Sequence, residues 1–277
     1  MALRMALCNE VVRELEFPRQ CALAAALGYD GIELAPFTLS DTPHKLPVST
    51  IALVRRAASD AGIVVSGLHW LLIKPDGLSL TSADAAVRAD TLDVMRRLVD
   101  LCAAVEGTYL VHGSPAQRRL PADGAATARA WVEEALMRAG EAAGKAGVTY
   151  CVEPLAPRLT NCFTSVAEAA EFVARAGLPA LRAMLDNSAA TLGEAEAPDM
   201  LLDRWLPTGL IAHVHVNDAN QRGPGQGADR FAPMVRALRR HGYAGWVGVE
   251  PFEYVPDGPA AAACAIGYMR GIEEALA

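Results

Sequence analysis

The 277-residue sequence predicts an α/β fold, a single-domain (β/α)8 TIM barrel that spans residues 1–277. Eight short apolar runs end in polar residues, and segments with helical periodicity lie between them. The centres of these runs are roughly 28 to 43 residues apart, which is the size of a βαβ repeat. Eight such repeats favour a closed parallel barrel over an open sheet, which usually has fewer strands.

The eight apolar runs, each with the polar residues that follow it, define the predicted strands in chain order. They span residues 4–10, 31–36, 64–70, 108–114, 149–155, 182–188, 211–218 and 246–252. The longest predicted helices span 84–105 and 126–147, and the second ends in Gly147 just before the next strand. The first strand leads into ALCNEVV, which lacks the G-x-G-x-x-G turn of dinucleotide-binding folds, so a nicotinamide-binding protein is not expected.

Composition and charge narrow the choice of partners. The net charge is −7, and the arginines form scattered pairs with acids nearby, so nucleic acid is not an expected partner. No apolar stretch reaches about 18 residues, and MALRMALCNEVV lacks the features of a signal peptide, so we expect a cytoplasmic protein that does not bind membranes. The six cysteines include no C-x-x-C pair and are expected to be reduced and mostly buried.

Nearly every predicted strand ends in a side chain that can ligate a metal, titrate or form a hydrogen bond. The active site of a (β/α)8 barrel lies at the C-terminal ends of its strands, so these positions are where chemistry is expected. In chain order they are Asn9 or Glu10, Glu33, His69, His112, Glu153, Asp186, His215 and Glu250.

The last four strand ends predict a metal site. Because side chains alternate along a strand, His213 and His215 face the lumen, and so do Glu153 and Glu250. Together with Asp186 they place three carboxylates and an imidazole at one mouth of the barrel, where the carboxylates would repel one another without a cation. Such a donor set suits Mn²⁺, Mg²⁺ or Co²⁺, with Mn²⁺ as the first choice. The alternative is a set of isolated salt bridges and structural histidines.

Four motifs carry a family resemblance: VEPL, MLDN, HVHVND followed by RGPGQG, and GVEPF, in this order. Over nearly its whole length the chain resembles the xylose isomerase-like TIM barrel superfamily, within it the sugar isomerase/epimerase group of ketose 3-epimerases, inosose isomerases and hydroxypyruvate isomerases. The resemblance implies that Glu153, Asp186, His215 and Glu250 ligate a divalent metal, and that Glu153 and Glu250 double as the acid/base pair. It also implies that Arg222 holds substrate oxygens and that the protein is a homo-oligomer, either a dimer or a tetramer.

Two positions depart from the pattern of the epimerases. These usually carry a histidine three residues after the aspartate and a glutamate six residues after the first glutamate, where this chain has Ala189 and Leu159. Both family side chains help to grip a ketose, so the departures argue against a 3-epimerase of free hexuloses and leave the metal chemistry intact. Asn161 or Arg158, in the same loop as Leu159, is the expected substitute for substrate binding.

Two further histidines end predicted strands and are candidates for hydrogen bonds to substrate, with a structural role as the alternative. His69 ends the third strand and is expected to face the lumen, and His112 ends the fourth strand in the same way. The turn after His112 could aim Gln117 or Arg118 at a ligand. Glu33 either lies near the site, as in the superfamily, or anchors a neighbouring arginine or lysine.

The leading functional hypothesis is a divalent-metal-dependent isomerase or epimerase of a small carbohydrate, a keto sugar or related polyol. It would remove a proton next to a carbonyl through a metal-stabilised enediolate. The close alternative is a lyase or hydrolase that acts on a 3-keto-glycoside by elimination, including C-glycoside cleavage. An abasic-site endonuclease would need a three-metal cluster with more histidines and a basic groove, and this acidic chain has only six histidines, so that function is disfavoured. A non-catalytic sugar-binding barrel would have no use for two opposed glutamates, so it is a remote alternative.

Overall fold

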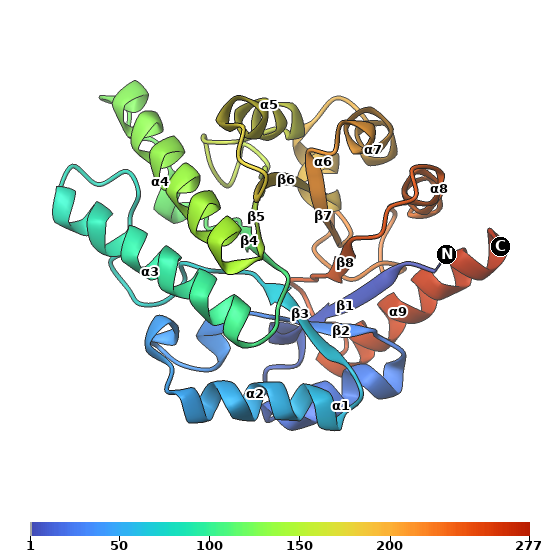
Figure 1. Cartoon of the computed structure of the whole chain (residues 1–277). Helices are drawn as coiled ribbons and strands as arrows, with labels where there is room; N and C mark the ends of the chain where they lie inside the picture. The colour runs from blue at the N-terminus through green and yellow to red at the C-terminus, as the bar shows by residue number, and fades with distance from the viewer. Residues whose placement is uncertain (1) are drawn as a thin grey trace.

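Eight parallel strands close into a barrel in the computed structural model, which describes residues 2–277. The strands follow one another around the barrel in chain order, and β8 pairs with β1 (Figure 1). Their bounds are β1 (Arg4–Cys8), β2 (Gly31–Leu34), β3 (Val64–Leu68), β4 (Tyr109–His112), β5 (Thr149–Val152), β6 (Leu181–Asp186), β7 (Ile211–Val216) and β8 (Trp246–Val249). Each strand coincides with one predicted run, so the predicted (β/α)8 barrel is confirmed.

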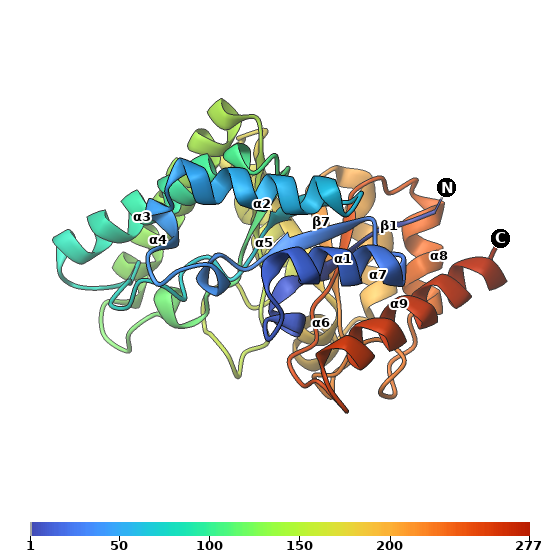
Figure 2. The same cartoon turned by 90° about the horizontal axis from the view of Figure 1, so that it is seen from below.

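Helices follow the strands and surround the barrel, as two views at right angles show (Figures 1 and 2). They are α1 (Phe17–Leu27), α2 (Val48–Asp60), α3 (Ala85–Ala104), α4 (Ala125–Ala146), α5 (Val166–Ala176), α6 (Asn187–Gly193), α7 (Pro198–Trp205), α8 (Ala232–Arg240) and α9 (Gly258–Ala275). The two longest predicted helices correspond to α3 and α4. The side chain of Asp84 caps α3 by accepting from the amide of Ala86, and Gly147 ends α4 with a left-handed φ of 74°.

The strands present different layers of side chains to the lumen and to the helices. A small buried cluster fills the lumen and consists of Ala6, Tyr109, Val111, Cys151, Met184 and Trp246. The main core lies between the strands and the helices and includes Leu110, Val152 and Val214. Because side chains alternate along each strand, the polar residues at the C-terminal strand ends stand above the lumen cluster.

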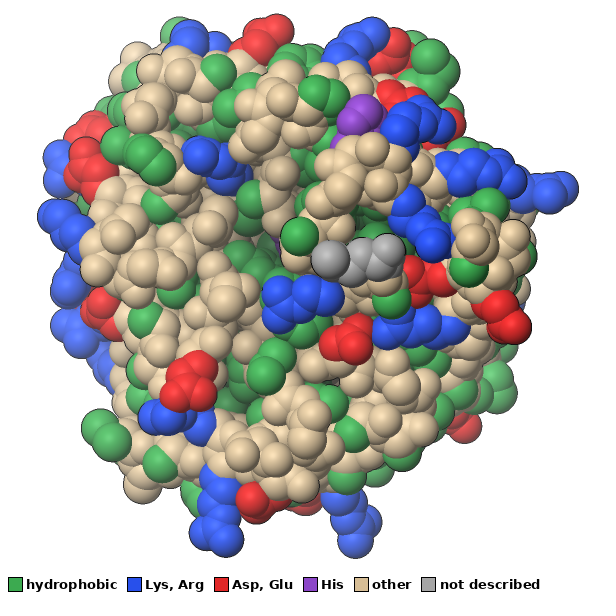
Figure 3. Space-filling view, turned by 45° about the vertical axis from the view of Figure 1, so that its right-hand side comes forward, with side chains coloured by type: hydrophobic (Ala, Val, Ile, Leu, Met, Phe, Trp, Pro, Cys, Tyr) green, Lys and Arg blue, Asp and Glu red, His purple; other side chains and the backbone are tan. Residues whose placement is uncertain are grey.

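The surface carries charges of both signs. On the face seen in Figure 3, lysine and arginine side chains lie among aspartate and glutamate side chains and form no continuous basic stripe. Among the helices of residues 2–277, none combines the length and the apolar character needed to cross a bilayer. All six cysteines are free, and only Cys264 is exposed, which confirms that the thiols are mostly buried.

Candidate metal centre

Four side chains from four neighbouring strands converge at the C-terminal mouth of the barrel. Glu153 directly follows β5, Asp186 ends β6, His215 lies in β7 and Glu250 directly follows β8. One potential ligand atom of each lies within 4.8 Å of those of the other three, and all four residues are buried. Ligands that bind one ion at about 2.1 Å are at most about 4.2 Å apart, so small side-chain movements would suffice to hold an ion. The fold thus brings together the four side chains that the sequence suggests as ligands.

Asp186 offers one carboxylate oxygen that has no partner. Its Oδ1 accepts a hydrogen bond from the amide of Ala189 at 2.6 Å and so caps the N-terminus of α6. Its Oδ2 is buried and has no hydrogen-bond partner in the described part of the chain. Burial, together with Glu153 and Glu250, raises the pKa of Asp186 to about 7. A cation at this position would satisfy the oxygen and favour the ionised carboxylate, so the donor set fits a divalent metal.

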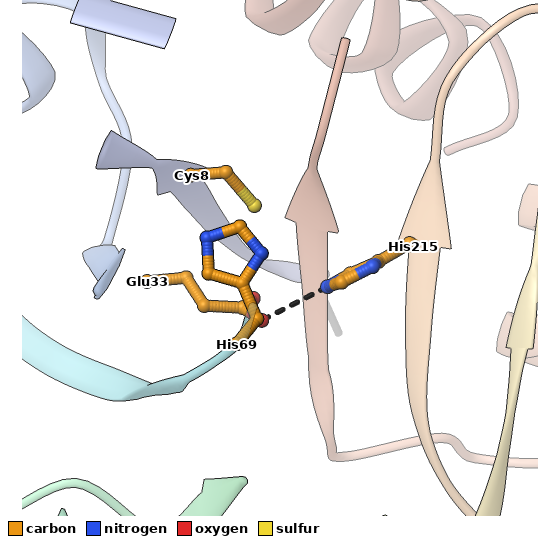
Figure 4. A group of neighbouring side chains, drawn as sticks. All are labelled: Cys8, Glu33, His69 and His215. Carbon is orange, nitrogen blue, oxygen red and sulfur yellow. Dashed lines mark hydrogen bonds and ion pairs between the residues drawn. The ribbon is translucent and has the colours of Figure 1, made fainter. Parts of the chain in front are cut away.

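The ring of His215 is held between carboxylates on both sides. Its Nδ1 lies 2.9 Å from Oε2 of Glu250 and 3.7 Å from Oε1 of Glu153. Its Nε2 donates to Oε1 of Glu33 at 2.9 Å, the bond drawn in Figure 4. A metal-ligating histidine usually donates its second ring N–H to such a carboxylate, which fixes the tautomer and the orientation of the ring. Nδ1 is therefore the atom of His215 that would face an ion.

Glu33 is a fully buried carboxylate that holds the histidines of β7. Besides the bond from His215, it accepts from the hydroxyl of Tyr109 at 2.7 Å, and Nε2 of His213 lies 3.3 Å away. Burial raises the pKa of Glu33, but His215 and His213 outweigh burial and hold it well below its usual range. Of the two alternatives for Glu33, the structure supports the place near the site and not the arginine or lysine partner. The side chains that bond to Glu33 or lie within 3.3 Å of its carboxylate come from β4 and β7, and they are a tyrosine and two histidines.

The segment that follows β3 holds Glu250 from the other side. Oε1 of Glu250 accepts from Nε1 of Trp70 at 2.6 Å, and Nδ1 of His69 lies 3.0 Å from the same oxygen. Nε2 of His69 lies 2.9 Å from Oε2 of Glu10, so the ring bridges two carboxylates. Burial opposes protonation of His69, but Glu10 and Glu250 outweigh it and raise the pKa of His69 to about 10. Burial likewise opposes ionisation of Glu250, but His215 and His69 lower its pKa to about 2.

Glu10 and Trp70 have contacts that sequence reasoning missed. The sequence leaves open whether Asn9 or Glu10 ends the first strand. Alternation along a strand puts Glu10 on the same side as Cys8, and this signal would have indicated that Glu10 faces the lumen. The backbone of Trp70 has a φ of 51°, in the left-handed region that non-glycine residues rarely adopt. No pattern in the sequence signals this turn, which brings the indole N–H to Glu250.

A second group of potential ligands lies behind the first. Figure 4 shows Cys8, Glu33 and His215 on three strands and His69 directly after β3, all pointing toward one another, and their ligand atoms lie within 4.8 Å of one another. His215 and Glu33 are already bonded to each other, and burial together with Glu33 raises the pKa of the Cys8 thiol well above its usual range. Glu33 thus supports His215, and we assign no second ion to this group.

His112 faces the helices and not the lumen. It is in register with Val152, a member of the core between strands and helices, and its Nδ1 lies 2.7 Å from the hydroxyl of Tyr150. The expected lumen orientation of His112 is wrong, because alternation along β4 gives the lumen positions to Tyr109 and Gly113. Burial lowers the pKa of His112 to about 3, which is consistent with a neutral ring in this core.

Arg118 is fully buried and fixes strand ends. Its guanidinium donates to the backbone oxygens of His112 at 3.3 Å and of Glu153 at 2.6 Å. The expectation that the turn after β4 aims this side chain at a ligand is therefore wrong. Arg118 instead ties the ends of β4 and β5 together beside Glu153.

The other two residues suggested for substrate binding lie in loops and already have partners. Nε of Arg222 is 3.7 Å from Oε2 of Glu253, and the Arg222 side chain is 39% exposed. Oδ1 of Asn161 accepts from the amide of Leu120 at 2.8 Å, and its Nδ2 donates to the oxygen of Leu120 at 3.0 Å. Asn161 thus pins the loop after β5 to the loop after β4, whereas Arg222 has a single long contact.

Gly113→Ala is expected to weaken metal binding. A Cβ at Gly113 would stand 2.2 Å from Oε2 of Glu153, so the carboxylate would have to move. We expect the affinity for Mn²⁺, measured by titration calorimetry, to fall about tenfold or more. Gly144→Ala in α4 is the matched control, because its Cβ would lie 3.5 Å from the Cβ of Ala180 and alanine favours helix. Equal Mn²⁺ affinities in the two variants would contradict this role for Gly113.

The affinity for Mn²⁺ is expected to fall as the pH drops below 7. The pKa of Asp186 is raised to about 7, so below that pH an incoming ion must displace the proton from this carboxyl. We expect about a tenfold loss of affinity per pH unit below about pH 7 and a plateau above about pH 8. Calorimetry in two buffers of different ionisation enthalpy should show proton release on binding at about pH 6. An affinity that does not change over this range would rule out Asp186 as a ligand with this pKa.

Comparison with known proteins agrees with this architecture. The family model described as the xylose isomerase-like TIM barrel matches residues 21–272. A D-psicose 3-epimerase of Agrobacterium fabrum is 29% identical over 233 residues, which cover 82% of this chain and 76% of the relative. A putative hydroxypyruvate isomerase of Streptomyces coelicolor is 27% identical over 252 residues, 86% of each chain.

A solved structure shows the same fold. The 3-keto-D-glucoside 4-epimerase of E. coli superposes with a TM-score of 0.81 at 19% identity, over 98% of this chain and 100% of the other. At this identity the likeness extends to the fold alone. The family match, in contrast, extends over nearly the whole sequence. The chain belongs to the xylose isomerase-like TIM barrel family.

Proposed function

We propose that the protein is a divalent-metal-dependent isomerase or epimerase of a small keto sugar or related polyol. The observation that carries the proposal is the group of three carboxylates and one imidazole whose ligand atoms lie within 4.8 Å of one another at the barrel mouth. The two sequence relatives support it, since one is named a D-psicose 3-epimerase and the other a putative hydroxypyruvate isomerase. Each of these names contains a compound, D-psicose or hydroxypyruvate, in which a hydroxyl-bearing carbon adjoins a carbonyl.

The donor set favours a hard divalent cation. Three carboxylate oxygens and one imidazole nitrogen suit Mn²⁺, Mg²⁺ or Co²⁺, and Mn²⁺ is our first choice. When bound, the cation would act as a Lewis acid that stabilises the negative charge of an enediolate. His215, oriented by Glu33, and Asp186, with its unpartnered Oδ2, would hold it together with Glu153 and Glu250.

Glu153 and Glu250 are the candidates for proton transfer. They follow β5 and β8, and each contributes an atom to the cluster. A carboxylate can remove a proton next to a carbonyl when the charge that develops is stabilised. Return of a proton to the same carbon from the opposite face would epimerise the sugar. Return to the neighbouring carbon would isomerise it.

Arg222 is the proposed contact to substrate oxygens. The single 3.7 Å contact of Arg222 with Glu253 leaves the guanidinium free to turn, and its loop directly follows β7. Both ring nitrogens of the buried His69 face carboxylates, so in this proposal His69 acts on the substrate only through Glu250. In this proposal Asn161 and His112 act indirectly, because Asn161 fixes two loops and His112 fixes the helix-facing side of β4.

Elimination from a 3-keto-glycoside is the second candidate reaction. Two positions at which the epimerases carry polar groups are apolar here, namely Ala189, which is buried, and Leu159, which is 41% exposed. Apolar side chains at these positions would suit the aglycone of a glycoside better than the hydroxyls of a free ketose. The same proton removal next to a carbonyl would then expel the group on the following carbon.

Deuterium exchange tests the proposed function. Protein loaded with Mn²⁺ is incubated in D₂O with D-psicose, hydroxypyruvate or a 3-keto-glucoside, and the products are followed by NMR. Deuterium next to the carbonyl without fragment release is the expected result, whereas release of the aglycone would favour elimination. The control is protein stripped with EDTA, which should be inactive and recover with Mn²⁺. Full turnover by the stripped protein, or by the Glu153→Gln Glu250→Gln double variant, would refute the proposal.

We also propose that the chain works in the cytoplasm as one domain over residues 1–277 and assembles as a homodimer or tetramer. Several apolar side chains are exposed and could lie between subunits, among them Val48 at 83% and Leu53 at 65%, both on α2. Light scattering on the purified protein would measure the assembly. A monomer at micromolar concentration would contradict the oligomer.

A further inference from the structure

The two candidate bases differ in the hydrogen bonds that they already accept. Oε1 of Glu250 receives Nε1 of Trp70 at 2.6 Å and Nδ1 of His69 at 3.0 Å. Oε2 of Glu250 lies 2.9 Å from Nδ1 of His215, within the ligand cluster. A carboxylate oxygen accepts along two lone pairs, so Oε1 is fully used and Oε2 faces the ion position. Glu250 therefore has no open oxygen for a substrate proton.

Glu153 has the opposite surroundings. Within residues 2–277 no hydrogen bond is donated to its carboxylate, and Nδ1 of His215 stays 3.7 Å from Oε1. Its Oε2 occupies the space beside Gly113, where a Cβ would come within 2.2 Å of it. Arg118 fixes only the backbone oxygen of Glu153 and leaves the side chain free. Glu153 thus combines a fixed main chain with a carboxylate oxygen that can accept a proton.

The donors to Glu250 are themselves held in place. Nε2 of His69 lies 2.9 Å from Oε2 of Glu10, so the ring lies between the carboxylates of Glu10 and Glu250. Trp70 has a φ of 51°, a conformation that needs support from its surroundings, and its ring packs 6.1 Å from the rings of Phe37 and Phe252. The bond from Trp70 to Glu250 is therefore a built feature of the site and not an incidental contact.

We propose that Glu250 serves only as a metal ligand, that Glu153 is the single base, and that the enzyme consequently isomerises its substrate and does not epimerise it. This inference rests on the proposed function and specifies its reaction. His69 and Trp70 act as positioning residues, because they occupy Oε1 of Glu250. A single base can reach one face of the substrate, whereas inversion needs a proton donor on the opposite face.

The proton transfers balance without an oxidant or reductant. Glu153 takes the proton from a carbon that bears a hydroxyl and adjoins the carbonyl, and the electrons of that C–H bond form a C=C bond. The hydroxyl proton of this carbon then passes to the former carbonyl oxygen. The electrons of the C=C bond take the proton back from Glu153 at the neighbouring carbon, while the first carbon becomes the carbonyl. The product is an isomer with a new C–H bond on the face that Glu153 occupies.

The first test compares the two glutamates in D₂O. Glu153→Gln and Glu250→Gln, each at saturating Mn²⁺, are incubated with D-psicose, D-fructose or hydroxypyruvate, and NMR follows deuterium next to the carbonyl. We expect exchange to fall at least about 100-fold in Glu153→Gln and at most about tenfold in Glu250→Gln. Wild type should show no inversion at C3 of either ketose. Interconversion of D-psicose and D-fructose by wild type, or equal losses in the two variants, would overturn the single-base assignment while the proposed function stands.

The second test measures Mn²⁺ affinity and needs no turnover. Trp70→Phe and His69→Leu each remove a donor to Oε1 of Glu250, so we expect the affinity to weaken about tenfold. Phe37→Leu is the control, because this ring packs against Trp70 and does not bond to Glu250. If all three variants bind Mn²⁺ as wild type does, His69 and Trp70 do not position Glu250. If wild type incorporates no deuterium into any probe with Mn²⁺, Mg²⁺ or Co²⁺, the proposed function fails and the single-base assignment fails with it.

Discussion

Asp186→Asn is expected to bind Mn²⁺ at least about 100-fold more weakly than wild type while keeping the fold. Asparagine retains a side-chain oxygen for the amide of Ala189 and is a good N-cap, so α6 should begin as before. What the variant loses is the negative charge that a cation would meet at Oδ2, the buried oxygen without a partner. Calorimetry measures the affinity, and deuterium exchange should be lost in parallel.

Without metal, the same substitution should stabilise the protein. The pKa of Asp186 is raised from 3.8 to about 7, so the native state favours the proton more than the unfolded state does. This carboxyl therefore lowers the free energy of unfolding as the pH rises between these values, by roughly 4 kcal/mol at most above about pH 7. At about pH 8 in EDTA, Asp186→Asn should melt above wild type. Excess Mn²⁺ should reverse the order, because only wild type gains the binding energy.

The control for Asp186 is Asp203→Asn on α7. Asp203 pairs with Arg240 and His241 on the surface, and it lies before the N-terminal end of β7, whereas the ligand set lies at the C-terminal ends of the strands. Adding Mn²⁺ should raise the melting temperature of this variant by as much as it raises that of wild type. Asp186→Asn that binds Mn²⁺ with the affinity of wild type would exclude Asp186 as a ligand.

Glu33→Gln is expected to lower the free energy of unfolding by about 3 to 5 kcal/mol, the usual cost of removing one partner from a buried charge pair. Glu33 is fully buried between His215, Tyr109 and His213, all of which can donate to it. The glutamine amide has one acceptor oxygen, and its NH₂ group would face one of these donors. That donor would be left buried without an acceptor. Thermal melting should fall by about 10 °C or more. Mn²⁺ affinity should fall about 10- to 100-fold, because the ring of His215 loses its orienting carboxylate.

Two milder variants test whether the charge of Glu33 is the cause. Tyr109→Phe removes one hydrogen bond to the carboxylate and should cost about 1.5 to 3 kcal/mol. Ser66→Ala removes the hydroxyl that lies 3.0 Å from the hydroxyl of Tyr109, and should cost about 1 kcal/mol. A loss of stability in Glu33→Gln no larger than that in Ser66→Ala would mean that the buried carboxylate is not a main support of the barrel.

The barrel and the four-residue cluster were predictable because both follow from local patterns. Apolar runs of strand length recur at the spacing of βαβ repeats, and in a closed parallel barrel their C-terminal ends must meet at one mouth. Alternation then places Glu153 and Glu250 on the lumen side, as it does His215. These inferences need only the period of a strand and the topology of the sheet.

The contacts behind the cluster were not predictable, because they depend on register and backbone shape. Which lumen side chains touch Glu33 depends on how β2, β4 and β7 are staggered around the barrel, and β2 shifts register against β3 between Ile32 and Glu33. Trp70 reaches Glu250 through a left-handed backbone turn. His112 could have been placed correctly from the sequence. Alternation along β4 puts it on the helix-facing side with Val152, whereas the expectation considered only its position at the end of the strand.

The bond between Glu33 and the ring of His215 has a consequence for the speed of metal uptake. This bond and those from Trp70 and His69 to Glu250 join side chains of the protein itself, so they can order the ligands before an ion arrives. In small domains that fold around their metal, capture is coupled to folding of the chain. Here the association rate should instead follow the water-exchange rate of the incoming cation, so that Mn²⁺ enters faster than Mg²⁺, which dehydrates reluctantly. Stopped-flow mixing with each ion would display that order directly.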